Sequence, residues 1–359
     1  MAILARGAIR KPWGLATGLL LLVAGCGHPL VPKSALSPTP TPPEQSAHYD
    51  APILGVDLYS LRRYTPAVVR FDGQRSLNYI KRMLHAQNVG VMWNFYSTSN
   101  TSDAVSQTSI SLTPAEVAVL TREAYRLNMR VEYRPIIRVG PHWTWEGHLA
   151  PRNQHAWFAS LLKAEAPYLR VAQKLHVSTF VVGTELKNLA GSPDWPAFLA
   201  QVRSIYRGTV TYASYQGDYI SQPPILPRTG KYGVDAYPNV KLPASATIGQ
   251  LTAAWEHYFG QVSPGLLAKT TLEEVGIPAR DGAYHHPSEW SLPGRPDQQV
   301  QARWFAAACQ VAFHYHMEGI YFYEVNLADD PTHPFPFAAF FEKTKGAQAI
   351  QDCRRIFHT

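Results

Sequence analysis

Charged residues are scarce in this chain of 359 residues, and no long run of Lys or Arg occurs in it. They make up 16% of the sequence, and the formal net charge of +7 is spread over isolated sites and short pairs such as Arg62-Arg63 and Arg354-Arg355. Nucleic-acid binding usually depends on basic residues gathered on one face. We therefore expect no nucleic-acid partner, and the positive balance suits an anionic envelope surface instead.

Cysteine is equally scarce, with three residues in the chain. Apart from Cys26, only Cys309 and Cys353 remain, and two cysteines do not form a recognisable disulfide pattern. The sequence leaves open whether they form a disulfide in an oxidising compartment after export. The histidine pairs at 285–286 and at 314 and 316 lack the HExxH-like spacing of a metal site. A metal site needs convergent ligands, so we expect neither a metal ion nor a cofactor.

The apolar run near the amino terminus, Leu15–Ala24, is too short to span a bilayer comfortably. It follows three basic residues within the first 11 positions and ends in Val23-Ala24-Gly25-Cys26. This order is typical of a cleaved export signal. The tetrapeptide resembles a bacterial lipobox, which predicts lipidation of Cys26 and a membrane tether. An ordinary signal peptide with an incidental cysteine is the alternative.

Proline dominates the segment that follows. Six prolines among Ser and Thr between Pro29 and Glu44 predict an extended, semi-rigid spacer. The sequence thus divides into a lipoprotein signal peptide over residues 1–25, a lipidated cysteine and linker over 26–50, and a single catalytic domain over 51–359. We expect an exported protein that is lipid-anchored in the cell envelope. The membrane face that carries the anchor stays open.

Strand-like and helix-like segments alternate through the remaining residues. Apolar, β-branched or aromatic runs predict eight strands, at Ile53–Tyr59, Val89–Tyr96, Val131–Val139, Phe180–Val182, Thr209–Ser214, Tyr232–Tyr237, Lys269–Val275 and Gly319–Asn326. Between them, Thr113-Pro114-Ala115-Glu116 is typical of a helix start, and helices are predicted over His155–Lys174, Trp195–Tyr206 and Asp297–His316.

This alternation favours an α/β fold of the (β/α)8 TIM-barrel type. An open, doubly wound sheet is the competing fold. No glycine-rich phosphate fingerprint follows the first predicted strand, where Gly55-Val-Asp57-Leu-Tyr59 stands instead. The barrel is therefore the expected architecture.

Two glutamates stand at the carboxyl ends of predicted strands four and seven, where barrel enzymes place catalytic groups. They are Glu185 and Glu274. Regular alternation puts Glu274 on one face with Leu272 and Thr270, so Glu273 is expected to point away. Two carboxyl groups that face each other across the barrel mouth are typical of the acid/base and nucleophile of a retaining glycosidase. The alternatives are a helix-start acid for Glu185 and a surface ion pair for Glu274.

The surrounding stretches carry a family resemblance. They are Val182-Gly-Thr-Glu185-Leu, Gly233-Val-Asp-Ala-Tyr237, Glu274-Val-Gly276 with Asp281-Gly-Ala283 after it, and Gly319-Ile-Tyr, with softer matches at Thr144-Trp-Glu-Gly147, Ala156-Trp-Phe-Ala159 and Val210-Thr-Tyr-Ala213. From about Ile53 to Gly346 the chain resembles clan GH-A glycosidases, and within the clan most resembles glycoside hydrolase family 113, the β-mannanase family. The resemblance implies a (β/α)8 barrel with Glu185 as acid/base and Glu274 as nucleophile. It also implies that Tyr237 lies near the nucleophile and donates a hydrogen bond to it; a packed rim aromatic is the alternative.

Three stretches depart from the family pattern. Arg134-Pro-Ile136-Ile137-Arg138 stands where the family tends to show Lys-Pro-His with an acid following. Gly276-Ile277-Pro278 replaces Gly-Tyr-Arg, and Phe322-Tyr323 replaces paired tryptophans. These positions would line the subsites nearest the scissile bond. Another envelope or environmental glycan therefore stays open beside β-1,4-mannan.

Aromatic residues at or just beyond strand ends are the candidates for stacking on sugar rings. They are Tyr96, Trp143, Trp145, Tyr215, Tyr237 and Tyr323. We expect a monomeric, retaining glycoside hydrolase that cleaves a β-linked polysaccharide or oligosaccharide, with β-1,4-mannan as the first substrate to test. A non-catalytic carbohydrate-binding envelope lipoprotein on the same scaffold is the alternative, because a fold alone does not prove activity.

Overall fold

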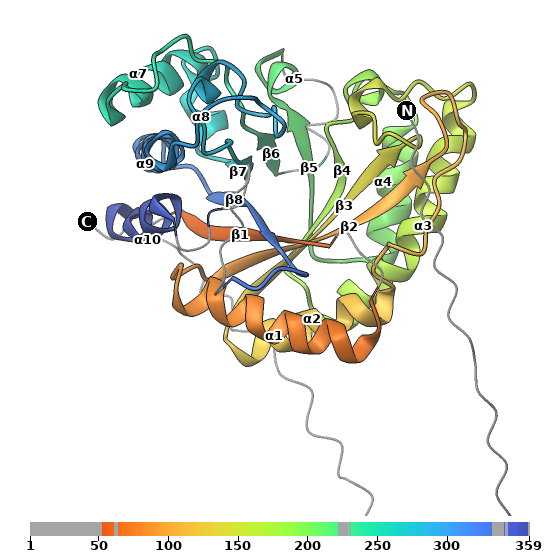
Figure 1. Cartoon of the computed structure of the whole chain (residues 1–359). Helices are drawn as coiled ribbons and strands as arrows, with labels where there is room; N and C mark the ends of the chain where they lie inside the picture. The colour runs from red at the N-terminus through yellow and green to blue at the C-terminus, as the bar shows by residue number, and fades with distance from the viewer. Residues whose placement is uncertain are drawn as a thin grey trace, which may run out of the picture. The chain divides into compact units, whose positions relative to one another are not determined.

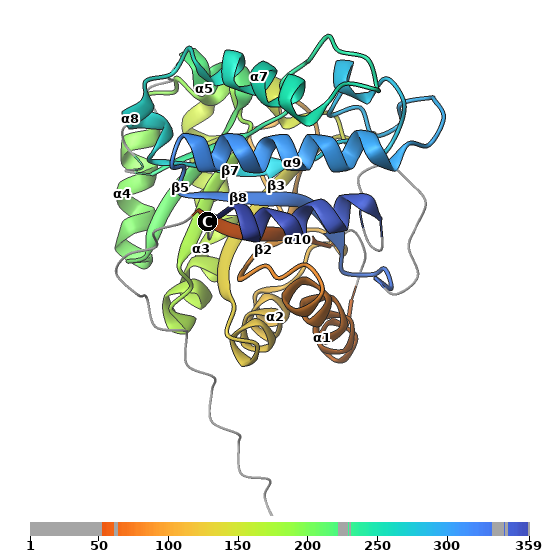
Figure 2. The same cartoon turned by 90° about the vertical axis from the view of Figure 1, so that its left-hand side faces the viewer.

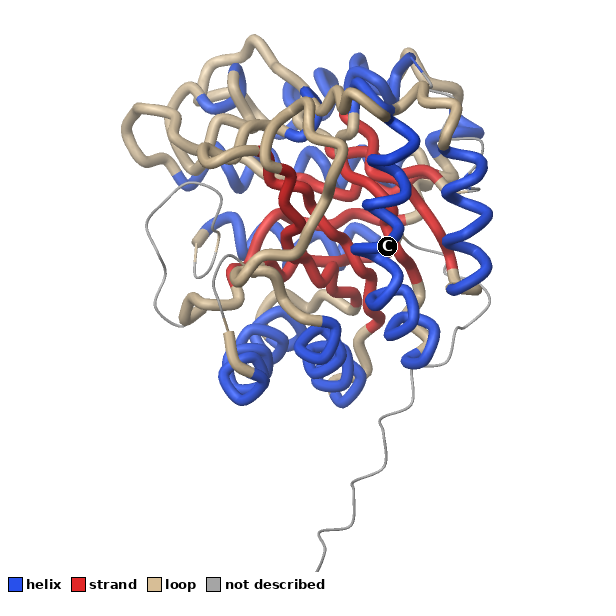
Figure 3. The backbone as a smooth tube through the Cα atoms, turned by 90° about the vertical axis from the view of Figure 1, so that its right-hand side faces the viewer, coloured by secondary structure: helices blue, strands red, loops and turns tan. Residues whose placement is uncertain are grey.

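Eight parallel strands form a closed barrel in the computed structural model, and helices surround it (Figure 1, Figure 3). The structure describes residues 52–60, 64–221, 229, 231–331, 341 and 344–357. The expected signal peptide, Cys26 and the linker lie outside these described residues. The predicted (β/α)8 TIM barrel is confirmed, and the competing open sheet is wrong.

The strands pair in chain order, and the eighth closes on the first. They are β1 (Ile53–Tyr59), β2 (Asn88–Ser97), β3 (Arg130–Val139), β4 (Thr179–Thr184), β5 (Thr209–Tyr215), β6 (Tyr232–Asp235), β7 (Thr270–Val275) and β8 (Gly319–Asn326). The main helices are α1 (Pro66–Arg82), α2 (Pro114–Arg126), α3 (Gln154–Leu175), α4 (Trp195–Ile205), α5 (Gln216–Ser221), α7 (Ile248–Phe259), α8 (Pro264–Leu267), α9 (Gln298–His314) and α10 (Lys345–Phe357), with short 3₁₀ turns at Glu146–His148, Lys187–Leu189 and Ala283–His285.

Local capping explains where several helices begin. At α2 the Thr113 hydroxyl accepts from the Glu116 backbone N–H, and the Glu116 carboxylate accepts from the Thr113 N–H at 2.8 Å, which completes a capping box. Asn153 caps α3 at 3.0 Å and Asp297 caps α9 at 2.8 Å. Replacing such a cap by Ala usually costs about 1 kcal/mol. The sequence-predicted helix starts are confirmed to within one residue.

Large aromatic side chains fill the layer between the strands and the helices. Trp93 of β2 is fully buried and stacks on Tyr168 of α3, with ring centroids 4.6 Å apart. Trp157, Trp195 and Trp304 are likewise fully buried. Burying such side chains gives the hydrophobic free energy that holds helices against the barrel.

The interior of the barrel is polar by contrast. Arg134 of β3 has no exposed surface, and its guanidinium contacts the carboxylates of Asp57 and Glu132 at 3.3 and 2.9 Å and that of Glu273 at 2.5 Å. Glycine leaves room for this set, since a Cβ on Gly90 would lie 2.3 Å from Asp57 Oδ1. A buried guanidinium needs such carboxylate partners, because burial of an isolated charge is very costly.

Extra residues interrupt the strands that carry the predicted glutamates. Between Leu272 and Val275, β7 spans three residues where β8 spans two. Similar shifts occur in β4 after Val181 and in β8 opposite β1. Such a bulge inserts one residue and re-aims the side chains that follow it.

The bulge in β7 overturns one expectation from the sequence. Leu272 packs in the outer hydrophobic layer, whereas Glu273 lies inside the barrel and binds Arg134. Glu274 also faces inward, into the cavity described below. The prediction that Glu273 points away from the interior was therefore wrong, because regular alternation does not hold across the inserted residue.

One disulfide fastens the end of the chain. Cys309 of α9 bonds to Cys353 of α10, with Cα atoms 5.5 Å apart, and Figure 2 shows the two helices side by side. Closing a loop of 44 residues removes unfolded-state entropy equivalent to about 4 kcal/mol in the chain-entropy model. Within the part of the chain that the structure describes, no helix has the length and apolar character needed to cross a membrane.

Candidate active site

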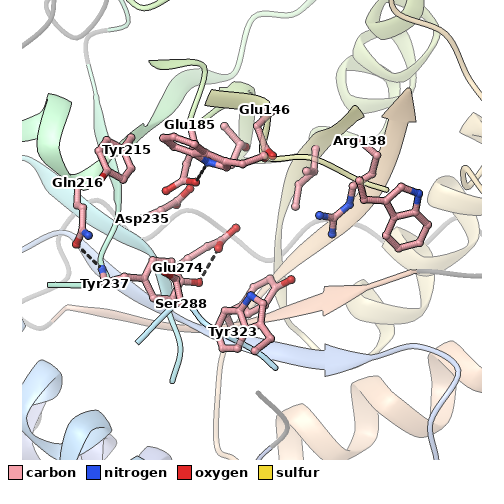
Figure 4. A pocket seen from close by; sticks show the side chains of 15 residues that line it. Arg138, Glu146, Glu185, Tyr215, Gln216, Asp235, Tyr237, Glu274, Ser288 and Tyr323 are labelled. Carbon is pink, nitrogen blue, oxygen red and sulfur yellow. Dashed lines mark hydrogen bonds between the residues drawn. The ribbon is translucent and has the colours of Figure 1, made fainter. Parts of the chain in front are cut away.

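A cavity of about 430 Å³ opens at the carboxyl ends of the strands (Figure 4). Its lining combines carboxyl groups, aromatic rings and one guanidinium: Ile136, Arg138, Trp143, Trp145, Glu146, Thr184, Glu185, Tyr215, Gln216, Asp235, Tyr237, Glu274, Ser288, Trp290 and Tyr323. The structure thus brings together both predicted glutamates. This is the end of the barrel where enzymes of this fold carry their chemistry.

Glu185 follows β4 directly and enters the cavity from the side opposite Glu274 in Figure 4. Its backbone is left-handed, with φ of 48°, a conformation that is uncommon for residues other than glycine. The Trp145 indole N–H donates to its Oε2 at 2.5 Å. Burial, with the negative charges of Glu146 and Glu274 nearby, raises the pKa of Glu185 well above its usual value. This carboxyl group is thereby favoured in its protonated form.

Glu274 has the contrasting environment of a stabilised carboxylate. Tyr237 donates its hydroxyl proton to Glu274 Oε2 at 2.7 Å, and Arg134 Nη1 lies 3.9 Å from Oε1. Burial is the largest influence and keeps the pKa of Glu274 above its usual value, while Arg134, the Tyr237 hydrogen bond and Arg138 offset part of that rise. Only 8% of the residue is exposed, so a surface ion pair does not describe it.

Tyr237 is itself fixed by a contact from the first residue of α5, the helix that follows the neighbouring strand β5. It lies two residues beyond β6, and its backbone N–H donates to the Gln216 side-chain oxygen at 2.9 Å. The predicted hydrogen bond from Tyr237 to the second glutamate is present in the structure. This contact favours the ligand-facing interpretation of Tyr237 over a merely packed rim aromatic.

Most of the predicted stacking residues line the cavity, and one does not. Trp143, Trp145, Tyr215, Tyr237 and Tyr323 are all in its lining. Tyr96 is outside the lining, and its backbone pairs with Ser106. Its role in binding stays a prediction without support from this geometry.

The comparisons with known proteins point to one family. The family model of Glycoside Hydrolase Family 113 matches residues 70–328. This chain belongs to glycoside hydrolase family 113. It is therefore a glycoside hydrolase. None of the curated proteins matches the chain.

Solved structures support the same fold for this family 113 hydrolase. A complex of a family 113 β-1,4-mannanase is 19% identical with a TM-score of 0.73, covering 85% of this chain and 99% of its own. The family 113 β-mannanase AaManA from Alicyclobacillus acidocaldarius, in complex with ManMIm, is 18% identical with a TM-score of 0.71, covering 85% and 98%. A family 5 mannosidase from Rhizomucor miehei, bound to mannosyl-fructose, is 12% identical with a TM-score of 0.54, covering 86% and 94%.

Two further carboxyl groups of the family 113 cavity were not singled out from the sequence. Burial raises the pKa of Glu146 to about 7. Asp235, the last residue of β6, is fully buried, and neither of its carboxyl oxygens has a hydrogen-bond partner among the described residues. Burial, with Glu274 and Glu185 nearby, raises the pKa of Asp235 well above its usual value. Both acids stand within the motifs that carry the family resemblance, which is the signal that could have found them.

Trp290 was also missed, because it lies in the long segment after β7 and not at a strand end. Its ring is 5.8 Å from that of Tyr237 and 5.4 Å from that of Tyr323, and all three line the cavity. A further aromatic pair, Trp145 and Tyr215, lies with ring centroids 5.0 Å apart. These rings give the site flat surfaces on which the apolar faces of sugars pack.

No metal site accompanies these groups. Over the described ranges, no three side chains of His, Cys, Asp or Glu are grouped so that they could hold a metal ion. The pKa shifts of Glu185 and Glu274 follow from burial, neighbouring charges and hydrogen bonds.

Proposed function

We propose that this family 113 protein hydrolyses a β-glycosidic bond with retention of configuration, with Glu185 as acid/base and Glu274 as nucleophile. The observation that carries the proposal is the contrast between two carboxyl groups in one cavity. Burial raises the pKa of both carboxyl groups, but the neighbours of Glu185 are negative charges that raise its pKa further, whereas Tyr237 and Arg134 favour the charged form of Glu274. Environments that push two carboxyl pKa values apart are typical of glycosidase acid and nucleophile pairs.

The proposed reaction has two steps. Glu185 gives its proton to the glycosidic oxygen as the bond to the anomeric carbon breaks, and Glu274 forms an ester bond with that carbon. Glu185, now a carboxylate, then takes a proton from water, whose oxygen attacks the anomeric carbon and releases Glu274. Each carboxyl group returns to its starting protonation state, so the cycle is closed.

β-1,4-Mannan is the first substrate to test. Two of the structurally similar proteins are described as family 113 mannanases, and the aromatic lining of the cavity suits a glycan. Every such glycan presents apolar sugar faces to rings such as Trp145 and Tyr215. The choice among glycans depends on the polar groups at the cavity wall.

Hydrolysis of a panel of soluble β-glycans by the full chain tests the proposal. We expect Glu274→Ala to lower kcat/KM by at least about a thousandfold, because the covalent step is lost. Added azide should restore turnover in that variant and give a product of inverted configuration. A Glu185→Ala variant should keep more activity on substrates with good leaving groups than on glycans, since those need no acid.

The alternative function is sugar binding without cleavage. It predicts that no glycan is cleaved and that sugar binding survives Glu274→Ala. Such a result would contradict the hydrolase mechanism, whereas azide rescue with an inverted product would establish the nucleophile.

We also propose that the protein is exported and held in the cell envelope by lipid on Cys26. The disulfide between Cys309 and Cys353 supports export, because disulfides persist in oxidising compartments. Labelled fatty acid should be incorporated into the protein in cells and should be lost in Cys26→Ser. Incorporation that survives this substitution would place the lipid elsewhere or leave the cysteine incidental.

A further inference from the structure

Arg138 presents a positive charge to the wall of the cavity. The residue directly precedes the end of β3, and Figure 4 shows its guanidinium directed toward the middle of the pocket, at the end remote from Tyr215 and Gln216. Its guanidinium carbon lies 5.4 Å from the ring centroid of Tyr59 and 5.4 Å from that of Trp143. Both rings are close enough to attract the cation through their π faces.

Neutral groups hold the side chain at one edge. Arg138 Nε donates to Tyr59 Oη at 2.9 Å and to Asn94 Oδ1 at 3.1 Å, and Nη2 also donates to Tyr59 Oη. The Tyr59 hydroxyl donates onward to Asn94 Oδ1 at 2.5 Å. Burial raises the pKa of Tyr59, so its hydroxyl stays neutral at pH 7. These hydrogen bonds fix the orientation of the Arg138 guanidinium, but the groups that accept them carry no negative charge to balance it.

No carboxylate of the described residues lies within 4.0 Å of the Arg138 nitrogens, and Nη1 has no hydrogen-bond partner among them. Arginine has five N–H donors in a planar fork, and it is almost never buried without a partner anion. Free donors on a partly buried cation that faces a cavity therefore indicate a ligand group with accepting oxygens.

Long-range support of the catalytic pair is the simpler role for this charge. Arg138 does lower the pKa of Glu274 and of Glu146. Acting at a distance, however, requires neither free N–H donors toward the cavity nor an exposed ring beside them. Trp143 is 43% exposed and lines the same part of the wall, which gives a sugar ring a surface to stack on.

We propose that Arg138 and Trp143 form a subsite for a sugar that bears an anionic oxyanion group, a carboxylate or a sulfate ester. The ring of the sugar packs on Trp143 while its anionic oxygens accept from Nη1 and the outer edge of Nη2. The inference rests on the proposed glycosidase function and narrows its substrate class to acidic β-glycans. Ile136, the wall residue beside Arg138, is uncharged, and Glu146, whose charge raises the pKa of Arg138, makes no ion pair with it.

Matched oligosaccharides test the subsite. β-1,4-Linked mannuronate and mannose oligomers share linkage and ring stereochemistry and differ only at C6, where a carboxylate replaces a hydroxymethyl group. Binding is measured by calorimetry with the Glu274→Ala variant of the full chain, so that no hydrolysis is needed. We expect the acidic oligomer to bind about 10- to 100-fold more tightly, the usual range for a charge-assisted contact. Mannose oligomers sulfated at C6 form a second arm that separates sulfate from carboxylate recognition.

The preference should depend on the guanidinium. In the Glu274→Ala background, Arg138→Gln should reduce the ratio of acidic to neutral affinity to about 3 or less, and Arg138→Lys should keep part of it because the charge remains. Arg170→Gln, on the exposed face of α3, removes the same net charge and should leave the ratio intact. This control separates a local contact from general attraction.

Four outcomes of these measurements have distinct meanings. Equal affinity for acidic and neutral oligomers overturns the subsite, as does an acidic preference that survives Arg138→Gln. If Arg138→Gln does not fold, the Arg138→Lys ratio and the parent preference decide in its place. Acidic binding through Arg138 without hydrolysis of any glycan by the parent chain would sustain the subsite while refuting the glycosidase mechanism.

Discussion

Two arginines of β3, Arg134 and Arg138, differ in what surrounds their charge. Arg134 lies in the barrel interior, where it contacts three carboxylates and has no exposed surface. Arg138 lies on the same face of β3, beyond Ile136, and its neighbours are the Tyr59 phenol, the Asn94 amide and the Trp143 ring. Arg134, whose charge is balanced by protein carboxylates, stabilises the fold. Arg138, which keeps N–H donors without a protein partner, is suited to bind a ligand.

The two charges also act on the catalytic pair from different directions. Arg134 supports Glu274 from beneath, at 3.9 Å, and is fixed there by Glu273. Arg138 lowers the pKa of the same carboxyl group from the cavity wall. Glu274, the proposed nucleophile, is thus stabilised as a carboxylate by the interior charge of Arg134 and by the charge of Arg138 at the cavity wall, to which we propose that a ligand binds.

The largest expected effect is on stability, from removal of the interior charge. Arg134→Met should lower the free energy of unfolding by about 3–5 kcal/mol, because loss of one partner leaves buried carboxylates uncompensated. Urea unfolding at pH 7 measures it, with Arg134→Lys as the control that keeps the charge. A loss below about 1 kcal/mol would mean that the surrounding carboxyl groups are neutral and need no cation.

Removal of the hydroxyl beside the nucleophile comes next. Tyr237→Phe should lower kcat/KM about 10- to 100-fold, since a hydrogen bond to a charged group contributes about 1.5–3 kcal/mol. The bond favours the charged form of Glu274, so its loss raises that pKa. The acidic limb of the pH–rate profile should therefore move to higher pH. An unshifted acidic limb would show that Arg134 alone sets the charge of the nucleophile.

Trp145→Phe should shift the basic limb of the pH–rate profile, and it should lower kcat/KM less than Tyr237→Phe does. The indole N–H donates to the Glu185 carboxylate and so lowers its pKa against the raising effect of burial. Without it, Glu185 keeps its proton to higher pH. Because Glu185 acts as the acid, the basic limb should move to higher pH while kcat/KM falls about tenfold. A basic limb that moves to lower pH would contradict the assignment of Glu185 as the acid.

The smallest expected effect is on stability, at the cavity wall. Arg138→Gln should change the free energy of unfolding by less than about 1 kcal/mol, because its hydrogen-bond partners are neutral and Tyr59 and Asn94 still bond to each other. Urea unfolding beside Arg134→Met tests the contrast directly. If both variants lost the same free energy of unfolding, the two arginines would contribute equally to stability and the proposed difference between them would be wrong.

Strand and helix positions were accessible from the sequence, because their signals are local. The β8 segment Gly319–Asn326 is rich in aromatic and β-branched residues, and Thr113 with Glu116 forms the capping box that their residue types predict. Glu185 and Glu274 were found because barrel enzymes concentrate chemistry at strand ends.

The rest of the site depends on contacts between distant segments. Asp235 was overlooked because its burial is set by neighbouring strands, and Trp290 because a long segment folds it back over the cavity. The inward turn of Glu273 follows from a bulge, which pairing with β6 and β8 creates and no local pattern reveals. The disulfide likewise required the packing of α9 on α10.

The bulge in β7 makes this strand sensitive to insertion or deletion of a single residue. Because of the bulge, two adjacent glutamates both face inward. Glu273 binds Arg134 in the barrel interior, and Glu274 faces the cavity. Substitution of Glu274 removes the cavity carboxyl group, whereas substitution of Glu273 removes a partner of the arginine that supports Glu274. Deletion of a single codon would restore regular pairing and leave one glutamate to fill both places. Length variation here should therefore be far less tolerated during evolution than in the loops that surround the cavity.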